Sequence, residues 1–201
     1  MRVRCCFLCL ILMIFLPVAG SAYKIEFAEQ FYRLYHQNLY RYPEEYQENI
    51  WYLERALRSP FANPLNALAR IDDRKEWQRY RTLFYMHVNL ELVKQYRGLA
   101  SKYDKREAYF YNYPWKSANL DSLETAESCY KTALSYWKEA LTWWAKLHTV
   151  DYVHLDEVEE WEDEVYRIDH GELDYGEFIA LDLARLQKVR DTFEKMDQST
   201  Y

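Results

Sequence analysis

The chain has 201 residues, a formal net charge of −6 at pH 7, and an unusual excess of aromatic residues, with 20 Tyr and 7 Trp. The charge becomes −8 if Arg2 and Arg4 are removed with the leader described below. This negative charge disfavours nucleic acid as a partner, because phosphate binding needs a basic surface. Tyr and Trp bury large areas and keep a polar group, so their excess suits helix packing and protein contact surfaces.

Residues 1–22 are predicted to be a cleaved secretory signal peptide. Arg2 and Arg4 precede an uncharged apolar run, and Gly20-Ser21-Ala22 offers small residues for cleavage before Tyr23. The alternative is an uncleaved anchor, but the run is shorter than the about 20 residues that span a bilayer. We therefore expect a periplasmic protein that contacts the membrane only through this segment if it is uncleaved. Residues 23–201 are expected to form one all-helical domain.

The region after the leader contains a single cysteine, Cys129. An exported chain with one thiol has no internal disulfide, so its stability is expected to come from packing. A small buried hydrophobe is the favoured interpretation of Cys129.

Apolar residues recur at steps of three and four along most of the chain, which predicts helices. Asp72 and Asp73 can cap one helix, and Gly171 is expected to end another. The fold class is therefore all-α, with antiparallel α-hairpins packed as a bundle or as a short tetratricopeptide-like solenoid. The expected helices, in chain order, cover residues 24–41, 44–58, 65–71, 74–99, 102–111, 121–148, 155–168 and 175–196.

The helix over residues 121–148 is expected to be central, because it carries a wide and partly aromatic face. Asp121 is its predicted N-cap, with Glu124 completing a capping box. No Gly or Pro interrupts it. The predicted packing stripe consists of Leu123 followed by Ala126, Tyr130, Leu134, Trp137, Leu141 and Trp144.

Five aromatic residues fall within seven positions, from Tyr109 to Trp115. They cannot all be buried in one turn, and any that remain exposed would form an anchor patch for a partner. The candidate partner-binding residues are therefore Tyr109, Tyr111, Tyr113 and Trp115. Packing in the core is the alternative role for most of them.

Two charged segments allow more than one interpretation. His148, Asp151 and His154 could hold zinc, but two histidines in a polar connector are more often solvated. The acidic run from Asp156 to Glu164 is expected to be a solvated face, or else a docking strip for a basic partner.

Enzyme signatures are absent from the sequence: there is no G-x-S-x-G, no H-E-x-x-H and no Gly-rich phosphate loop. We therefore expect no catalytic residues, no cofactor and no metal-ligating residues.

The run Ala126-x-x-x-Tyr130-x-x-Ala133-Leu134 resembles the second helix of a tetratricopeptide repeat, and Trp77-x-x-Tyr80-x-x-x-Phe84 resembles the first. Together with the leader, the segments AESCYKTALSYWKEAL and GELDYGEFIALDLARLQKVR resemble small periplasmic tetratricopeptide-like proteins of the spirochaete flagellar collar. The resemblance implies a scaffold at the periplasmic flagellar motor that acts through protein contacts and without catalysis.

Two functions follow as expectations. The first is an exported helical scaffold or adaptor whose partners are other periplasmic or envelope proteins. The alternative is a helical small-ligand-binding accessory protein of a solute transporter, with an apolar pocket lined by Tyr130, Trp137 and Trp144.

Overall fold

The computed structural model describes residues 24–197 and residue 199, so the predicted signal peptide, residues 1–22, lies outside the described residues. Within them the fold is all-α, as predicted, and no strand is present. The α-helices are α2 (Ala28–Arg41), α3 (Tyr46–Arg58), α4 (Arg74–Tyr103), α5 (Lys116–Leu147), α6 (Glu159–Asp169) and α7 (Tyr175–Lys195). Three 3₁₀ turns are η1 (Pro64–Asn66), η2 (Phe110–Trp115) and η3 (Asp156–Val158).

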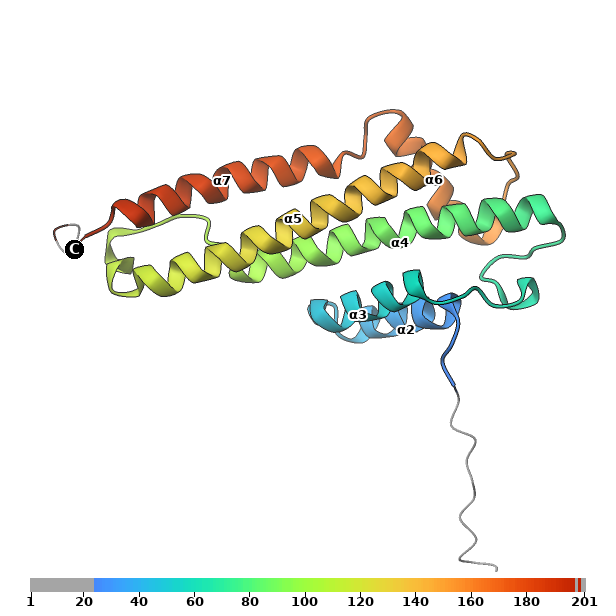
Figure 1. Ribbon diagram of the computed structural model, residues 1–201, viewed down its shortest axis with the longest axis horizontal. Helices are drawn as coiled ribbons and strands as arrows, with labels where there is room; N and C mark the ends of the chain where they lie inside the picture. The colour runs from blue at the N-terminus through green and yellow to red at the C-terminus, as the bar shows by residue number, and fades with distance from the viewer. Residues whose placement is uncertain (1–23, 198, 200–201) are drawn as a thin grey trace, which may run out of the picture.

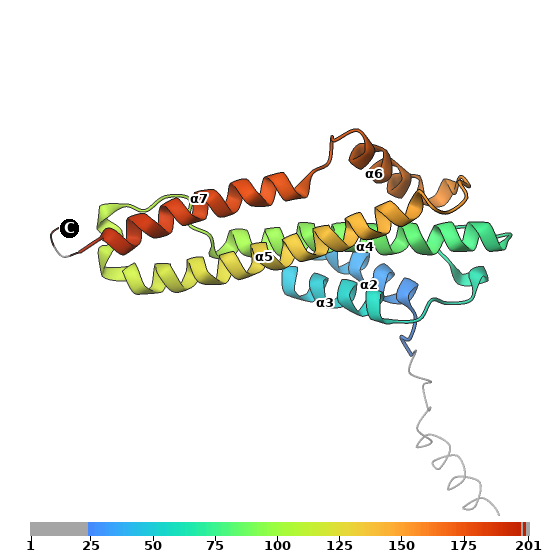
Figure 2. The ribbon, with the colours of Figure 1, turned by 45° about the horizontal axis from the view of Figure 1, so that its top comes forward.

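The helices form an elongated bundle around α4 (Figures 1 and 2). α4 and α5 run antiparallel along the length of the molecule, and α7 packs on α5. The hairpin of α2 and α3 packs against α4 on the other side, and α6 contacts α4 near one end. α4 and α5 have 30 and 32 residues, so each is nearly as long as a whole tetratricopeptide repeat of about 34 residues.

Helix ends follow the predicted capping chemistry at several places. The Asp73 carboxylate accepts hydrogen bonds from the backbone N–H groups of Lys75 and Glu76, and the Glu76 side chain returns to the N-cap backbone. After α6, Gly171 has a φ of 71°, a conformation that glycine adopts without a Cβ penalty.

The prediction of a helix is wrong for two segments. The segment 65–71 holds no α-helix and only the end of the single turn η1. The side chain of Asn63, the N-cap of η1, accepts a hydrogen bond from the Leu65 N–H. The segment 102–111 is not a helix, because α4 ends at Tyr103 and the chain then turns away. At this C-cap the Asp104 carboxylate is bound by Arg185 of α7 and by the Tyr130 hydroxyl of α5.

The predicted cap of the central helix is also wrong. α5 begins at Lys116, directly after the Pro114-Trp115 pair, so Asp121 lies inside the helix rather than at its N-cap. Pro114 lies inside the turn η2, before the N-cap Trp115, so it removes no hydrogen bond from α5.

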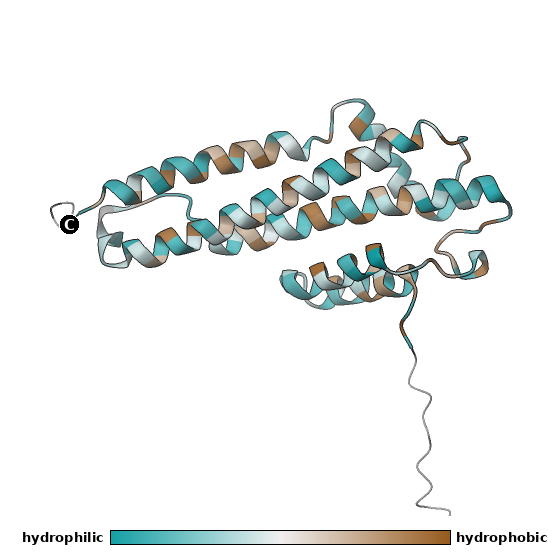
Figure 3. Ribbon diagram, in the orientation of Figure 1, coloured by the Kyte–Doolittle hydropathy of each residue, from teal (hydrophilic) through white to brown (hydrophobic). Residues whose placement is uncertain are grey.

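α4 is the most enclosed helix, since helices cover it on several sides. Hydrophobic residues recur along α4, α5 and α7 (Figure 3). Between Tyr80 and Val93 the buried residues of α4 lie on all of its faces, and they include His87 and Glu91. Within the described part of the chain, no helix combines the length and the apolar character needed to cross a membrane.

Candidate functional site

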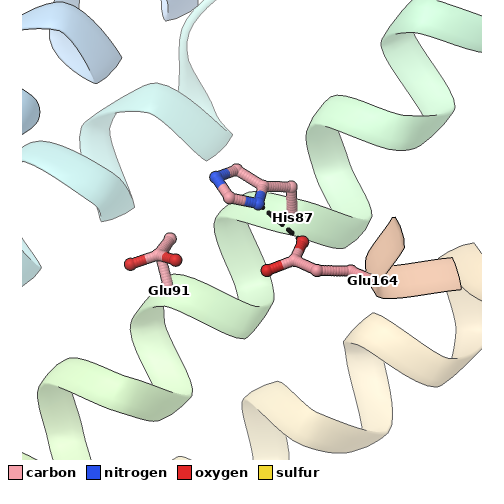
Figure 4. A group of neighbouring side chains, drawn as sticks. All are labelled: His87, Glu91 and Glu164. Carbon is pink, nitrogen blue, oxygen red and sulfur yellow. Dashed lines mark hydrogen bonds and ion pairs between the residues drawn. The ribbon is translucent and has the colours of Figure 1, made fainter. Parts of the chain in front are cut away.

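A buried polar cluster lies where α4 meets α6 (Figure 4). His87 and Glu91 are one turn apart on α4 and therefore share a face, and Glu164 reaches them from α6. All three side chains are largely withdrawn from solvent. The imidazole Nδ1 of His87 lies 2.6 Å from a carboxylate oxygen of Glu164.

The packing of α6 explains how an acidic residue enters the interior. Trp161 and Val165 are buried against the core, and Glu164 lies on the same side of the helix because it is three residues after Trp161. The Trp161 indole stacks on the His87 ring, with centroids 4.9 Å apart and planes at 18°. The hydrophobic face of α6 therefore carries Glu164 into contact with α4.

The hairpin α2–α3 supplies a second set of polar groups around the cluster. The Tyr32 hydroxyl lies 2.7 Å from His87 Nε2, and the Tyr35 hydroxyl donates to Glu91 at 2.5 Å. Gln95 of α4 donates to the Tyr35 oxygen at 3.3 Å. The imidazole with its proton on Nδ1 satisfies both of its contacts, since it donates to Glu164 and accepts from Tyr32.

Lys94 is the cation of the cluster. Its ammonium lies 2.5 Å from one oxygen of Glu91 and 3.4 Å from Glu164. Burial alone would lower the pKa of Lys94, but the two carboxylates raise it above its usual value. Burial likewise tends to raise the pKa of Glu91, yet His87, Lys94 and the Tyr35 hydrogen bond hold that pKa below its ordinary value. The group is thus a connected charge network rather than an isolated buried acid.

The donor atoms of the cluster suit a metal ion chemically. Imidazole nitrogen and carboxylate oxygen are the usual ligands of zinc and related ions. Ligand atoms of His87, Glu91 and Glu164 all lie within 4.8 Å of one another, and no other group of three or more such residues comes together in the described region. Sequence analysis missed this site and predicted no metal ligands.

The missed signal was the pair His87 and Glu91 at a spacing of four inside an apolar helix. An amphipathic helix places its polar residues toward water, whereas α4 is buried on all of its faces in this stretch. The third residue was hidden in the acidic run, where Glu159, Glu160 and Asp163 are indeed exposed and only Glu164 is buried.

The predicted aromatic anchor lies at the opposite end of the molecule, in η2. Tyr109, Tyr111 and Trp115 are 46%, 52% and 61% exposed, whereas Tyr113 is half-buried and packs on the core. The rings of Tyr109 and Tyr111 stack in parallel with centroids 5.3 Å apart. Three of the four candidate residues therefore present aromatic surface to solvent.

The predicted packing stripe of α5 is shifted around the helix. Leu123, Ala126, Tyr130 and Trp137 are buried as predicted, but Leu134, Leu141 and Trp144 are only partly buried. Ala133, Ala140 and Leu147 face inward in their place. Small alanines thus occupy buried positions of α5, and the larger residues beside them are only partly covered.

The three residues expected to line a ligand pocket are used in other ways. Trp137 packs against Tyr175 and against Gly176, where a Cβ would lie 2.9 Å from its indole nitrogen. Trp144 donates to Asp169 from its indole nitrogen. Tyr130 borders a polar cavity of about 560 Å³ that neither tryptophan lines.

The three connector residues that the sequence analysis considered as possible zinc ligands lie in separate ion pairs. His148 lies 3.2 Å from Asp169, and His154 lies 2.9 Å from Asp156. Asp151 instead pairs with Lys75 at 2.8 Å. These contacts agree with two solvated histidines in a polar connector.

Comparison with known proteins gives one match. The model of a family described as a domain of unknown function, DUF8513, matches residues 75–196. No curated protein and no solved structure matches the chain. The matched span runs from the first turn of α4 to the end of α7 and includes His87, Glu91 and Glu164. Because this span covers more than half of the chain, the protein belongs to the DUF8513 family.

Proposed function

We propose that this protein is an exported, periplasmic helical adaptor that assembles with other envelope proteins through the aromatic surface of η2. The observation that carries the proposal is the exposure of Tyr109, Tyr111 and Trp115 on one short turn. Tyr and Trp are enriched among the residues that dominate protein–protein binding energy. A cluster of them in water is an unfavourable surface for a protein that has no partner.

Hydrogen bonds between Tyr109 and Asn112 hold the aromatic segment locally, and the start of α5 that follows it is tied to its neighbours. Lys116, the first residue of α5, donates from its ammonium to the backbone carbonyls of Glu194 and Met196. Ser122 donates to the carbonyl of Tyr103, which ties the start of α5 to the end of α4. A preorganised aromatic surface loses little conformational entropy when it binds.

The leader sequence supports the export part of the proposal, because its basic start, apolar run and small residues are typical of secretory signals. The finer proposal is a scaffold role in the periplasmic collar of a spirochaete flagellar motor. Its support is the resemblance of the central and C-terminal segments to the tetratricopeptide-like proteins of that assembly.

Affinity capture from detergent-solubilised cell envelopes tests the adaptor function. The wild-type chain should recover a defined set of proteins, and the double variant Tyr111→Ala/Trp115→Ala should lose them. Tyr40→Ala is the matched control, because Tyr40 is an exposed tyrosine on α2, outside η2. Equal recovery by all three proteins would exclude η2 as the binding surface, and recovery of nothing by the wild type would argue against an adaptor.

A further inference from the structure

We propose that His87, Glu91 and Glu164 form a binding site for one divalent transition-metal ion of the zinc type. The ion would be held between α4 and α6 and enclosed by α2. The ion would join α4 to α6, with a water molecule completing its coordination, in a chain whose region after the leader contains no second cysteine for a disulfide. This site is independent of the aromatic surface of η2.

Burial is the first argument. Two carboxylates and an imidazole are withdrawn from water in the interior of a small helical protein. Moving carboxylates from water into such an environment is strongly unfavourable unless cations compensate them. Hydrophobic side chains of similar volume would pack there without this penalty, so the charges call for a role that apolar groups cannot fill.

The geometry lies close to that of a coordination shell. Zinc binds His nitrogen and Glu oxygen at about 2.0–2.2 Å in a tetrahedral arrangement, so its ligand atoms lie about 3.4 Å apart. The ligand atoms of His87, Glu91 and Glu164 already lie within 4.8 Å of one another. Binding an ion therefore requires the side chains of the two glutamates to rotate.

The groups behind the ligands hold them in orientation. With the metal on Nδ1, His87 would donate its Nε2–H to the Tyr32 oxygen, which already lies 2.7 Å away. The Tyr35 hydroxyl holds one oxygen of Glu91, and the other, which Lys94 binds in this structure, is the one an ion would take. Such outer hydrogen bonds are characteristic of protein metal sites and fix the ring and the carboxylate.

Lys94 explains how the same site is neutralised without metal. Its ammonium contacts Glu91 and Glu164 together, which is the position of a bridging cation. Its side chain is 39% exposed, so the flexible stem can swing into water when an ion enters.

A permanent ion-pair network is the rival explanation, and Lys94 distinguishes the two. If the network were only structural, Lys94→Met would remove a needed cation and gain nothing. If the site binds metal, Lys94→Met removes the group that the ion must displace. The variant should then bind Zn²⁺ about tenfold more tightly than the wild type.

The experiment is calorimetric titration of Zn²⁺ into protein expressed from the full-length sequence and freed of metal with a chelator. We expect one equivalent to bind and the melting temperature to rise with it, since an ion that binds only the folded state stabilises that state. Ca²⁺ and Mg²⁺ should bind much more weakly, because they disfavour imidazole. Glu164→Gln and His87→Gln should weaken Zn²⁺ binding at least about tenfold, the size of effect that loss of even an outer-shell group produces.

Controls separate this site from others and from unfolding. Glu160→Gln changes an exposed acid one turn before Glu164 on the same helix and should leave Zn²⁺ binding unchanged. His148→Ala/His154→Ala should also leave it unchanged. The proposal is overturned if neither the wild type nor Lys94→Met binds one equivalent of Zn²⁺. It is equally overturned if the His148→Ala/His154→Ala variant alone loses binding.

Discussion

The guanidinium of Arg79 on α4 binds the carboxylate of Glu162 on α6 through two parallel hydrogen bonds, Nε to Oε1 at 2.7 Å and Nη2 to Oε2 at 2.5 Å. The two side chains are only 5% and 13% exposed. This paired contact lies on α6 two residues before Glu164 and fixes that helix against α4. A paired geometry of this kind is specific to arginine, because a lysine offers only a point charge.

Removing one partner of this pair should destabilise the fold strongly. Glu162→Ala leaves the Arg79 charge buried without its carboxylate and should lower the free energy of unfolding by about 3–5 kcal/mol. The double variant Arg79→Met/Glu162→Met should lose less than Glu162→Ala, because it buries no unpaired charge. Urea unfolding of the two variants measures this, and equal or greater loss in the double variant would contradict the account.

Gly98 should be required for its size rather than its flexibility. It lies inside α4, where alanine is ordinarily favoured over glycine by about 1 kcal/mol. Here a Cβ would lie 2.3 Å from a ring carbon of Tyr46 on α3. Gly98→Ala should therefore destabilise the protein by roughly 1–3 kcal/mol, as overpacking does.

A double-mutant cycle checks the stated cause. In the background Tyr46→Ala, where the ring is absent, Gly98→Ala should become neutral or stabilising in thermal unfolding. A penalty that persists without the ring would show that something other than the ring opposes the new methyl group.

Glu29 should make stability fall as pH rises. Burial raises its pKa above the ordinary value, and the Ala62 N–H, Arg33 and Arg81 offset only part of that effect. One carboxylate oxygen accepts from Ala62 at 2.9 Å, while the other is buried without a hydrogen bond. The folded state therefore holds a proton that the unfolded state releases at lower pH. Its stabilising contribution is present in acid and is lost as pH rises through the raised pKa.

Glu29→Gln removes this titration and provides the measurement. The free energy of unfolding of the variant minus that of the wild type should increase by on the order of 1 kcal/mol as the pH is raised from about 4 to about 8. Chemical denaturation at both pH values gives the difference. A stability difference that is independent of pH, or that changes in the opposite direction, would exclude the raised pKa.

Two tryptophans should behave in opposite ways. Trp161 is 1% exposed and contacts the rings of Tyr32, Phe84 and His87, so Trp161→Ala should lower the free energy of unfolding by about 3–5 kcal/mol. Trp115 is 61% exposed, so Trp115→Ala should change stability by less than about 0.5 kcal/mol. Thermal unfolding of both variants establishes whether a binding defect in Trp115→Ala can be separated from misfolding.

The sequence was sufficient for the helical class and for most helix ends that depend on local chemistry. Asp73 with Glu76, and Gly171, act within their own segments, so spacing and residue type predicted them correctly. Errors arose where a distant residue decides the local structure. Asp104 is the C-cap of α4, and its carboxylate is bound by Arg185, far along the chain, a contact that no local pattern contains.

The buried cluster shows the same division between local and distant information. The spacing of His87 and Glu91 places them on one face of a helix, which sequence alone reveals. Their burial depends on how α2 and α6 pack on α4, which the hydrophobic pattern of α4 does not specify. The exposure of Trp115 was within reach of sequence reasoning, because five aromatic residues cannot all be buried in so short a segment.

The central claim is that the aromatic surface of η2 contacts another protein. Its most direct test is a photoreactive phenylalanine analogue placed at position 115 in living cells, with position 40 as the control. The account predicts a discrete cross-linked product of higher mass from position 115 and none from position 40. The same pattern from both positions, or no product from position 115, would contradict it.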